Sequence, residues 1–351
     1  MPDRIFGAPP RYLQGAGALA QLAPLFGRLG RRPFILTDAA APEPLRQEIE
    51  QRLKETTDRV IFGVAGGPCS AAEIERFVET ARMLEADLLA GLGGALAIGL
   101  AKGVALTTRL PLVTVPTAPC CHAAVSRLVE IEGDGEAAAE TRLLPQPPEA
   151  VLVDTALVAA APPRLFIAGL GDAIARKFEL EHSTATGALN LLEGRPTLLA
   201  AASAEACYRA IREHAGAALA LRTRRSGGEA LEQVTEAMLL LGGLAHESGG
   251  PSIAHALARG LAMLPPCRTA LHGELVAFAL LAQLVFEDRP AALLGDLVGF
   301  HRSLGLPTRL DEIGIVTDAT AAAETAARRS LPTEGKKLAR AILAVDALQA
   351  R

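Results

Sequence analysis

The feature that most constrains the fold is an alternation of short apolar runs and helical stretches in the first half of the chain. The apolar runs have the length of strands and lack the alternation of polar and apolar residues that a half-exposed strand shows, which is typical of parallel strands buried on both faces. Helical patterns lie between them, and Ser70 with Glu73 forms a capping box at the start of one. This order predicts an α/β fold, a parallel sheet with helices on both faces. The predicted strands are Phe34–Thr37, Arg59–Phe62, Leu88–Leu92 and Leu112–Val115.

The pattern changes near Ala161–Pro163, after which helical segments dominate and are separated by glycine and proline. We therefore predict two domains, an α/β domain over residues 1–161 and a helical domain over residues 162–351. The predicted helices of the second domain are Arg164–Glu181, Ala201–Ala220, Glu229–Leu241, Ser252–Leu264, Leu271–Glu287 and two more near the C-terminus.

Composition excludes several classes of function. A net charge of −4 and a pI near 6.0 argue against a nucleic-acid surface, which needs a basic patch. The longest apolar stretch, Leu88–Ala101, is shorter than the roughly 20 residues of a membrane span. The five cysteines are irregularly spaced, and the N-terminus has no signal-like apolar run, so we expect a cytoplasmic protein with a small-molecule substrate.

A glycine-rich turn, Gly91–Gly94, lies between a predicted strand and a predicted helix. Glycines let the backbone approach a phosphate, and the N-terminus of the helix offers free N–H groups. Such turns also simply close strand–helix junctions, and the following residues, Ala95 and Leu96, supply neither a cation nor a hydroxyl. The turn by itself leaves both interpretations open.

Two histidines and an aspartate suggest a metal site. His255 and His272 flank the break at Pro265-Pro266, so two helices could direct both imidazoles into one space, and Asp172 could supply a carboxylate. Two His and one Asp leave coordination positions open on Zn²⁺ or Fe²⁺, as in catalytic sites. Spacing alone favours the alternative, in which Asp172 caps a helix and each histidine is an ordinary core or surface residue.

The order of the segments resembles the glycerol-dehydrogenase branch of the iron-containing (group III) alcohol dehydrogenase family, over nearly the whole chain. The stretch around Asp172 and the His-Gly-Glu at 272–274 are the most specific pieces. The matching segments are YLQGAGAL (Tyr12–Leu19), GLGGALAIGLAK (Gly91–Lys102), VPTAPCCHAAVS (Val115–Ser126), the stretch Val151–Arg176, HALARGL (His255–Leu261), HGELVAFALL (His272–Leu281) and GLPTRLDEIGI (Gly305–Ile315).

The resemblance implies a dehydroquinate-synthase-like architecture, with a Rossmann-like nucleotide-binding domain, an all-α metal-binding domain and an active site in the cleft between them. By this resemblance Asp172, His255 and His272 are the metal ligands, and the cofactors are Zn²⁺ or Fe²⁺ and NAD(P). The metal lowers the pKa of a substrate hydroxyl and a hydride passes to the nicotinamide. A homo-oligomer is expected by the same analogy.

The resemblance also supplies nucleotide-binding positions. Asp38, at the end of a predicted strand, favours NAD over NADP because a carboxylate repels a 2′-phosphate. The full set of expected nucleotide contacts is Asp38, Gly93, Gly94, Ala95, Thr117, Cys120, Ser126 and Leu128.

The chain departs from the family pattern at the cofactor and substrate positions. Leu96 and Gly99 stand where the family has a polar residue and an aspartate in the phosphate turn. His122 replaces an aspartate that would face a polyol, after two thiols (Cys120 and Cys121), and His246 replaces a phenylalanine. We therefore predict catalytic roles for His122, His246 and Cys121, as acid/base groups or extra metal ligands.

Two principal hypotheses follow. The first is a metal- and NAD(P)-dependent oxidoreductase acting on a small alcohol, polyol or carbonyl compound. The second is a metal-dependent lyase, isomerase or hydrolase that has lost the nicotinamide cofactor. A non-catalytic relative and a phosphate-handling relative rank lower, because the metal triad is kept and no cluster of Lys and Arg is present to grip a substrate phosphate.

Overall fold

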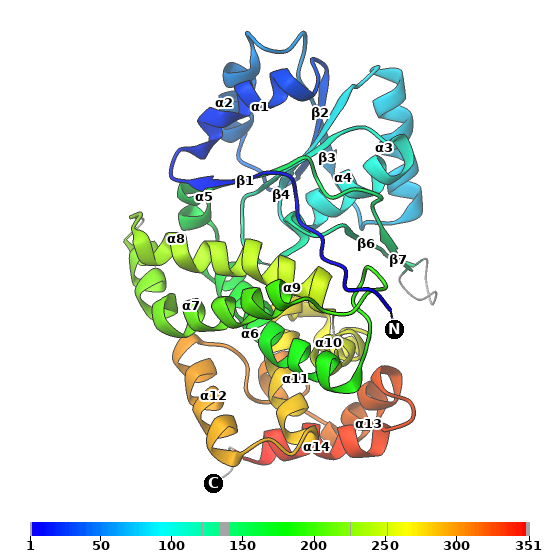
Figure 1. Cartoon of the computed structure of the whole chain (residues 1–351), viewed down its shortest axis with the longest axis vertical. Helices are drawn as coiled ribbons and strands as arrows, with labels where there is room; N and C mark the ends of the chain where they lie inside the picture. Colours follow the sequence, from blue (N-terminus) through cyan, green and yellow to red (C-terminus); the bar gives the residue numbers. More distant parts are fainter. Residues whose placement is uncertain (1, 121, 134–139, 225, 251, 349–351) are drawn as a thin grey trace. The chain divides into compact units, whose positions relative to one another are not determined.

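The computed structural model describes residues 2–120, 122–133, 140–224, 226–250 and 252–348. The chain forms two compact units (Figure 1). One comprises Gly7–Pro162 and Ala217–Gly243, and the other comprises Met1–Phe6, Pro163–Gly216 and Leu244–Arg351. The predicted division between residues 161 and 162 thus differs from these units at two segments. Met1–Phe6 groups with the helical unit, and Ala217–Gly243 groups with the unit that holds the sheet.

A six-stranded sheet, in which every strand pair is parallel, forms the centre of the first unit. The strand order is β1-β8-β5-β4-β2-β3, so the chain leaves β2 in one direction for β3 and then crosses back to β4. Such a reversal opens a crevice at the carboxyl ends of the two strands, here β2 and β4. The strands are β1 (Tyr12–Gly15), β2 (Pro33–Asp38), β3 (Ile61–Ala65), β4 (Leu88–Gly93), β5 (Leu112–Pro116) and β8 (Ala150–Asp154).

Helices cover both faces of this sheet (Figure 1). Phe34 and Leu36 of β2 pack into the core beneath α3 and α4, whereas Ile35 between them packs beneath α1 and α2. This opposite orientation of successive side chains explains why the strands are apolar throughout. The covering helices are α1 (Leu22–Leu29), α2 (Glu43–Leu53), α3 (Ala71–Met83) and α4 (Ala95–Thr108).

Smaller elements complete the first unit. An antiparallel pair of strands, β6 (Leu128–Ile131) and β7 (Glu140–Leu143), lies outside the main sheet. Two helices, α5 (Thr155–Ala160) and α8 (Glu229–Glu236), are joined by the hydroxyl of Thr155, which donates to the Glu232 carboxylate at 2.5 Å. A π-helical turn, Ala237–Leu241, follows α8.

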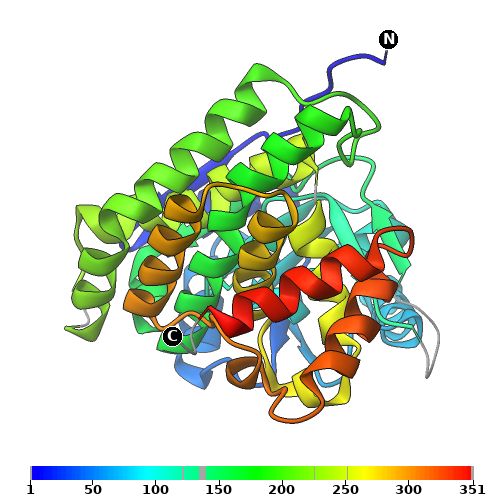
Figure 2. The same ribbon diagram turned by 90° about the horizontal axis from the view of Figure 1, so that it is seen from below.

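The second unit is helical. Helix α11 (His272–Phe286) packs against α6 (Pro163–Thr186), α10 (Ile253–Ala262) and α14 (Gly335–Ala347), and its side chains are almost all buried. A helix that is apolar on every side is suited to this central place. Figure 2 shows α13 (Ala319–Ser330) and α14 side by side, and both helices carry buried alanines. The unit also holds most of α7 (Leu198–Thr223), α9 (Gly242–Gly249) and α12 (Ala291–Leu304).

The fold class predicted from the sequence, an α/β nucleotide-binding domain with a helical domain, is confirmed. Some details differ. β3 begins at Ile61 and continues to Ala65, and β1, β6, β7 and β8 were not predicted as strands. Three helices rather than two follow α11 in the described part of the chain. Among the described residues, no helix combines the length and apolar character needed to cross a membrane.

Candidate functional site

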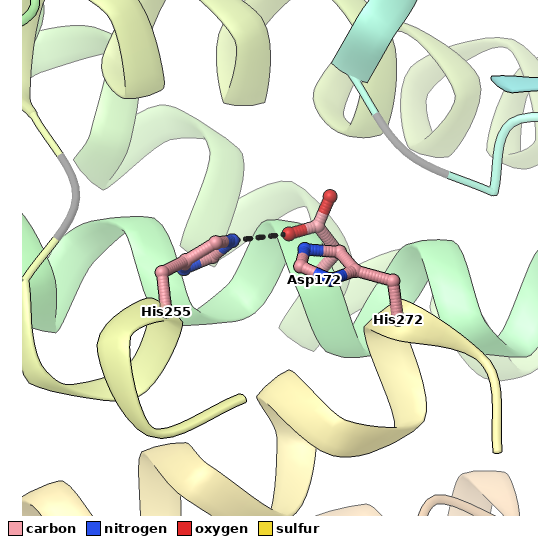
Figure 3. A group of neighbouring side chains, drawn as sticks. All are labelled: Asp172, His255 and His272. Carbon is pink, nitrogen blue, oxygen red and sulfur yellow. Dashed lines mark hydrogen bonds and ion pairs between the residues drawn. The ribbon is translucent and has the colours of Figure 1, made fainter. Parts of the chain in front are cut away.

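Three side chains of the helical unit form a group that could hold a metal ion. Asp172 lies on α6, His255 on α10 and His272 at the first position of α11, and each offers one ligand atom within 4.8 Å of the others. Both imidazoles point toward the carboxylate (Figure 3), and Nε2 of His255 lies 2.9 Å from Oδ1 of Asp172. Asp172 and His255 are buried, whereas His272 is exposed. Two imidazoles and one carboxylate with an accessible side are donors suited to a catalytic divalent ion.

Two glycines let α6 and α11 approach closely enough to form this group. A Cβ atom on Gly273 would lie 1.9 Å from the carbonyl oxygen of Ala168, and one on Gly171 would lie 2.5 Å from the carbonyl oxygen of Gly273. Each glycine directly adjoins a ligand, Asp172 or His272. The contact between the two backbones therefore sets the separation of these ligands.

Glu274 fixes the start of α11. Its Oε2 accepts the N–H of Leu271 at 2.7 Å, which caps the first turn. The same carboxylate receives both arms of Arg164 from α6, at 2.6 and 2.7 Å. His272 is thus placed by a helix start that is itself bonded to the helix carrying Asp172.

Glu179 orients His255. Its Oε2 lies 2.8 Å from Nδ1 of His255, and its Oε1 accepts the backbone N–H groups of Ser252 and His255. Burial acts to raise the pKa of Glu179, but the ion pairs with His255 and Arg176 outweigh it and hold the pKa at about 2. A carboxylate at Nδ1 leaves Nε2 for the metal, the arrangement that metal-binding histidines commonly show. The residues present therefore fit a divalent ion.

The protonation of His255 reflects the same neighbours. Burial and the Arg176 guanidinium act to lower the pKa of His255, but the Glu179 and Asp172 carboxylates outweigh them, and the pKa is raised above its ordinary value. Metal ligands must be deprotonated, so a metal ion has to displace this proton.

Sequence analysis did not identify Arg176 or Glu179 as part of this site. Arg176 donates to Oδ1 of Asp172 at 2.7 Å and to Oε2 of Glu179 at 3.1 Å, and its Nη1 lies 2.7 Å from Nδ1 of His246. The available signal was the spacing of Asp172, Arg176 and Glu179, at i, i+4 and i+7, which places all three on one face of a helix.

The glycine turn of the first unit follows β4, at the point where the strand order reverses between β2 and β4. Oδ2 of Asp38 accepts the N–H of Gly94 at 2.6 Å, and its Oδ1 accepts that of Ala97 at 3.2 Å, so this carboxylate caps the N-terminus of α4. Gly93 has a φ of 153°, and a Cβ there would lie 2.3 Å from Oδ2 of Asp38. The turn thus brings Asp38, Gly93 and Gly94 together where the strand order reverses.

The other expected nucleotide contacts lie at the start of α4 and in the segment that follows β5. The N–H of Thr117 donates to the carbonyl of Gly93 at 3.0 Å. The carbonyls of Ser126 and Leu128 accept from Nζ of the buried Lys102, at 3.0 and 2.5 Å. Ala95 begins α4, Cys120 follows β5 at intermediate exposure, and Leu96 packs against the core beneath α3 and α4.

The predicted acid/base residues lie in different parts of the chain. His246 is buried on α9 beside Arg176, and His122 is buried in a short 3₁₀ turn of the first unit, His122–Ala124. Cys121 lies outside the described residues. The sequence-based roles of these three residues stay predictions.

Comparisons with known proteins agree with this geometry. Residues 9–155 match the family of iron-containing alcohol dehydrogenases. The chain is 37% identical over 309 residues to a glycerol dehydrogenase of Thermotoga maritima, covering 88% of this chain and 84% of the relative. It is 33% identical to a glycolaldehyde reductase of Halobacterium salinarum, covering 89% and 85%. A probable glycerol dehydrogenase from Sinorhizobium meliloti has a similar structure, with a TM-score of 0.90, 33% identity and coverage of 98% and 99%.

The parallel sheet with its glycine turn and the helical unit with its Asp-His-His group define a metal-dependent oxidoreductase linked to a nicotinamide cofactor. The chain belongs to the iron-containing alcohol dehydrogenase family, in its glycerol-dehydrogenase-like branch. The family implies a divalent metal and NAD(P). None of these comparisons favours the alternative of a metal-dependent lyase, isomerase or hydrolase.

Proposed function

We propose that this enzyme interconverts a small polyol or hydroxyaldehyde with its oxidised or reduced partner, using a divalent metal at Asp172, His255 and His272 and NAD as the hydride carrier. The observation that carries the proposal is the convergence of these three donors within 4.8 Å. The substrate class rests on the relatives named glycerol dehydrogenase and glycolaldehyde reductase.

Different residues of this chain would bind the metal ion, orient its ligands and accommodate the diphosphate. Asp172, His255 and His272 hold the ion, and Glu179 keeps Nε2 of His255 directed at it. When bound, the ion supplies Lewis acidity that lowers the pKa of an alcohol beside it. The turn at Gly93 and Gly94 gives a diphosphate close access to the backbone.

Asp38 supports the choice of NAD. Its carboxylate stands at the end of β2, beside the glycine turn, where a 2′-phosphate would bring like charges together. The acid/base roles of His122, His246 and Cys121, the choice between Zn²⁺ and Fe²⁺, a homo-oligomeric assembly and a cytoplasmic location stay predictions.

The test combines metal analysis with activity on one preparation. The wild-type protein should retain about one divalent ion per chain, bind NADH and oxidise glycerol or reduce glycolaldehyde. Asp172→Ala should lose the metal and lower the turnover rate by at least about 10³-fold, because the Lewis acid is lost. Asp296→Ala is the matched control, since Asp296 is an exposed carboxylate of the same unit, paired with Arg212.

Failure would take a definite form. A metal-loaded wild-type protein that neither binds NADH at millimolar concentration nor turns over either substrate would disprove the proposed function. Retention of metal by the Asp172→Ala variant would disprove the ligand assignment.

A further inference from the structure

A buried arginine touches two of the three proposed metal ligands. Nη2 of Arg176 lies 2.7 Å from Oδ1 of Asp172 and 2.5 Å from Nε2 of His255. The side chain of Arg176 is 1% exposed, as is that of Asp172. The positive charge of a guanidinium is therefore held against the donors of the metal centre.

The guanidinium and a divalent ion need the same atoms. Zinc lies about 2.0–2.2 Å from an imidazole nitrogen or a carboxylate oxygen. Nδ1 of His255 faces Glu179, so Nε2 is the nitrogen available to a metal ion. A metal ion would bind the lone pair of Nε2, and a guanidinium nitrogen 2.5 Å from that atom occupies the space that the ion needs.

Arg176 has a second set of partners. Its Nη1 lies 3.1 Å from Oε2 of Glu179 and 2.7 Å from Nδ1 of His246. The guanidinium carries five N–H donors in a rigid fork, so Nη1 can keep these contacts while Nη2 leaves the metal ligands. His246 and Glu179 thus provide a place for the charge when the metal is bound.

The charges explain why a cation is needed in either state. The carboxylates of Asp172 and Glu179 are 1% and 0% exposed, and buried carboxylates without a counter-charge strongly destabilise a fold. Arg176 compensates for both of them, and a divalent ion would take over the charge of Asp172.

We propose that Arg176 is a built-in cation that competes with the divalent metal for Asp172 and His255, so that it weakens metal affinity and stabilises the metal-free centre. The inference rests on the metal site of the proposed function. It makes Arg176 a residue that sets metal affinity rather than one that touches the reacting atoms.

The experiment measures zinc affinity directly. Chelator-stripped protein is titrated with Zn²⁺ at pH 8 in competition with a chromophoric chelator. We expect Arg176→Gln to bind zinc at least tenfold more tightly than the wild-type protein. Lys177→Gln is the matched control, because Lys177 is the next residue of α6 and pairs with Glu181 and Glu205 away from the centre; its affinity should stay within twofold.

A thermal melt supplies the second readout. Metal-free Arg176→Gln should melt at a lower temperature than metal-free wild-type protein, and zinc should raise the melting temperature of the variant by more than that of the wild type. A purely structural role for Arg176 would lower the melting temperature without tightening zinc binding.

The zinc titration can overturn the inference about Arg176 in the following ways. Zinc affinity of Arg176→Gln equal to or weaker than that of the wild type overturns the inference and leaves the proposed function intact. If neither protein binds zinc or ferrous ion, the metal site itself is wrong and both proposals fall. Should Arg176→Gln not fold, Arg176→Lys keeps the charge but not the fork; tighter zinc binding in that variant supports the competition, and unchanged or weaker binding refutes it.

Discussion

Replacing Gly273 by alanine should damage the metal centre through the backbone alone. The new Cβ would lie 1.9 Å from the carbonyl oxygen of Ala168, whereas real Cβ contacts essentially never fall below 3.0 Å. The start of α11 must therefore move away from α6 by about 1 Å, and His272 moves with it. A misplacement of about 1 Å can reduce a rate by roughly 10²-fold. We expect zinc affinity to fall about 10–100-fold and the free energy of unfolding to fall by about 1–3 kcal/mol.

The measurements are a zinc titration against a chelator and urea unfolding of the metal-free protein. Gly171→Ala should have a smaller effect, because its Cβ would lie 2.5 Å from the carbonyl oxygen of Gly273. Gly295→Ala on α12 is the control: nothing lies within 4 Å of its Cβ, so it should leave zinc affinity unchanged and stabilise the helix by about 0.5–1 kcal/mol. Zinc binding by Gly273→Ala within twofold of wild type would refute the argument that this close contact sets the ligand geometry.

Three further predictions concern other sites. Burial lowers the pKa of His301 to about 4, from 6.5, so the folded protein favours the neutral ring. The contribution of this ring to the free energy of unfolding is fully present above pH 6.5, and up to about 3 kcal/mol is lost as the pH drops toward 4. His301→Leu should flatten this pH dependence in urea titrations, and an unchanged slope would count against it. Lys102→Met removes the bonds to the carbonyls of Ser126 and Leu128 and should cost about 2–3 kcal/mol, measured by urea unfolding; a loss below about 0.5 kcal/mol would contradict this role. Asp38→Asn should reduce the preference for NADH over NADPH by about tenfold in fluorescence titrations, and an unaltered ratio would remove Asp38 from cofactor selection.

Much of the first unit could be predicted from the sequence because its signals are local. The run at Phe34–Thr37 directs buried side chains to both faces, as expected for a strand that is covered on two sides. The side chain of Ser70 accepts the N–H of Glu73, as the capping box predicts. β1 (Tyr12–Gly15) could not be found this way, because its residues are only half-buried and form no apolar run.

The metal centre shows the opposite case. Spacing alone favoured ordinary roles for Asp172, His255 and His272, and only their resemblance to a family pattern joined them in one site. Arg176 and Glu179 stayed unrecognised, since an arginine and a glutamate on a helix are usually solvent-exposed.

The sequence by itself thus determined the class of fold, the places where helices begin and the residues able to bind a metal ion, because these depend on burial patterns and on bonds between near neighbours. The tertiary structure decided which of those residues meet. Asp172 and His255 are 83 positions apart, and their contact depends on close packing between helices, which no local pattern encodes. The same packing turns Arg176 inward, where the buried carboxylates of Asp172 and Glu179 require a positive charge.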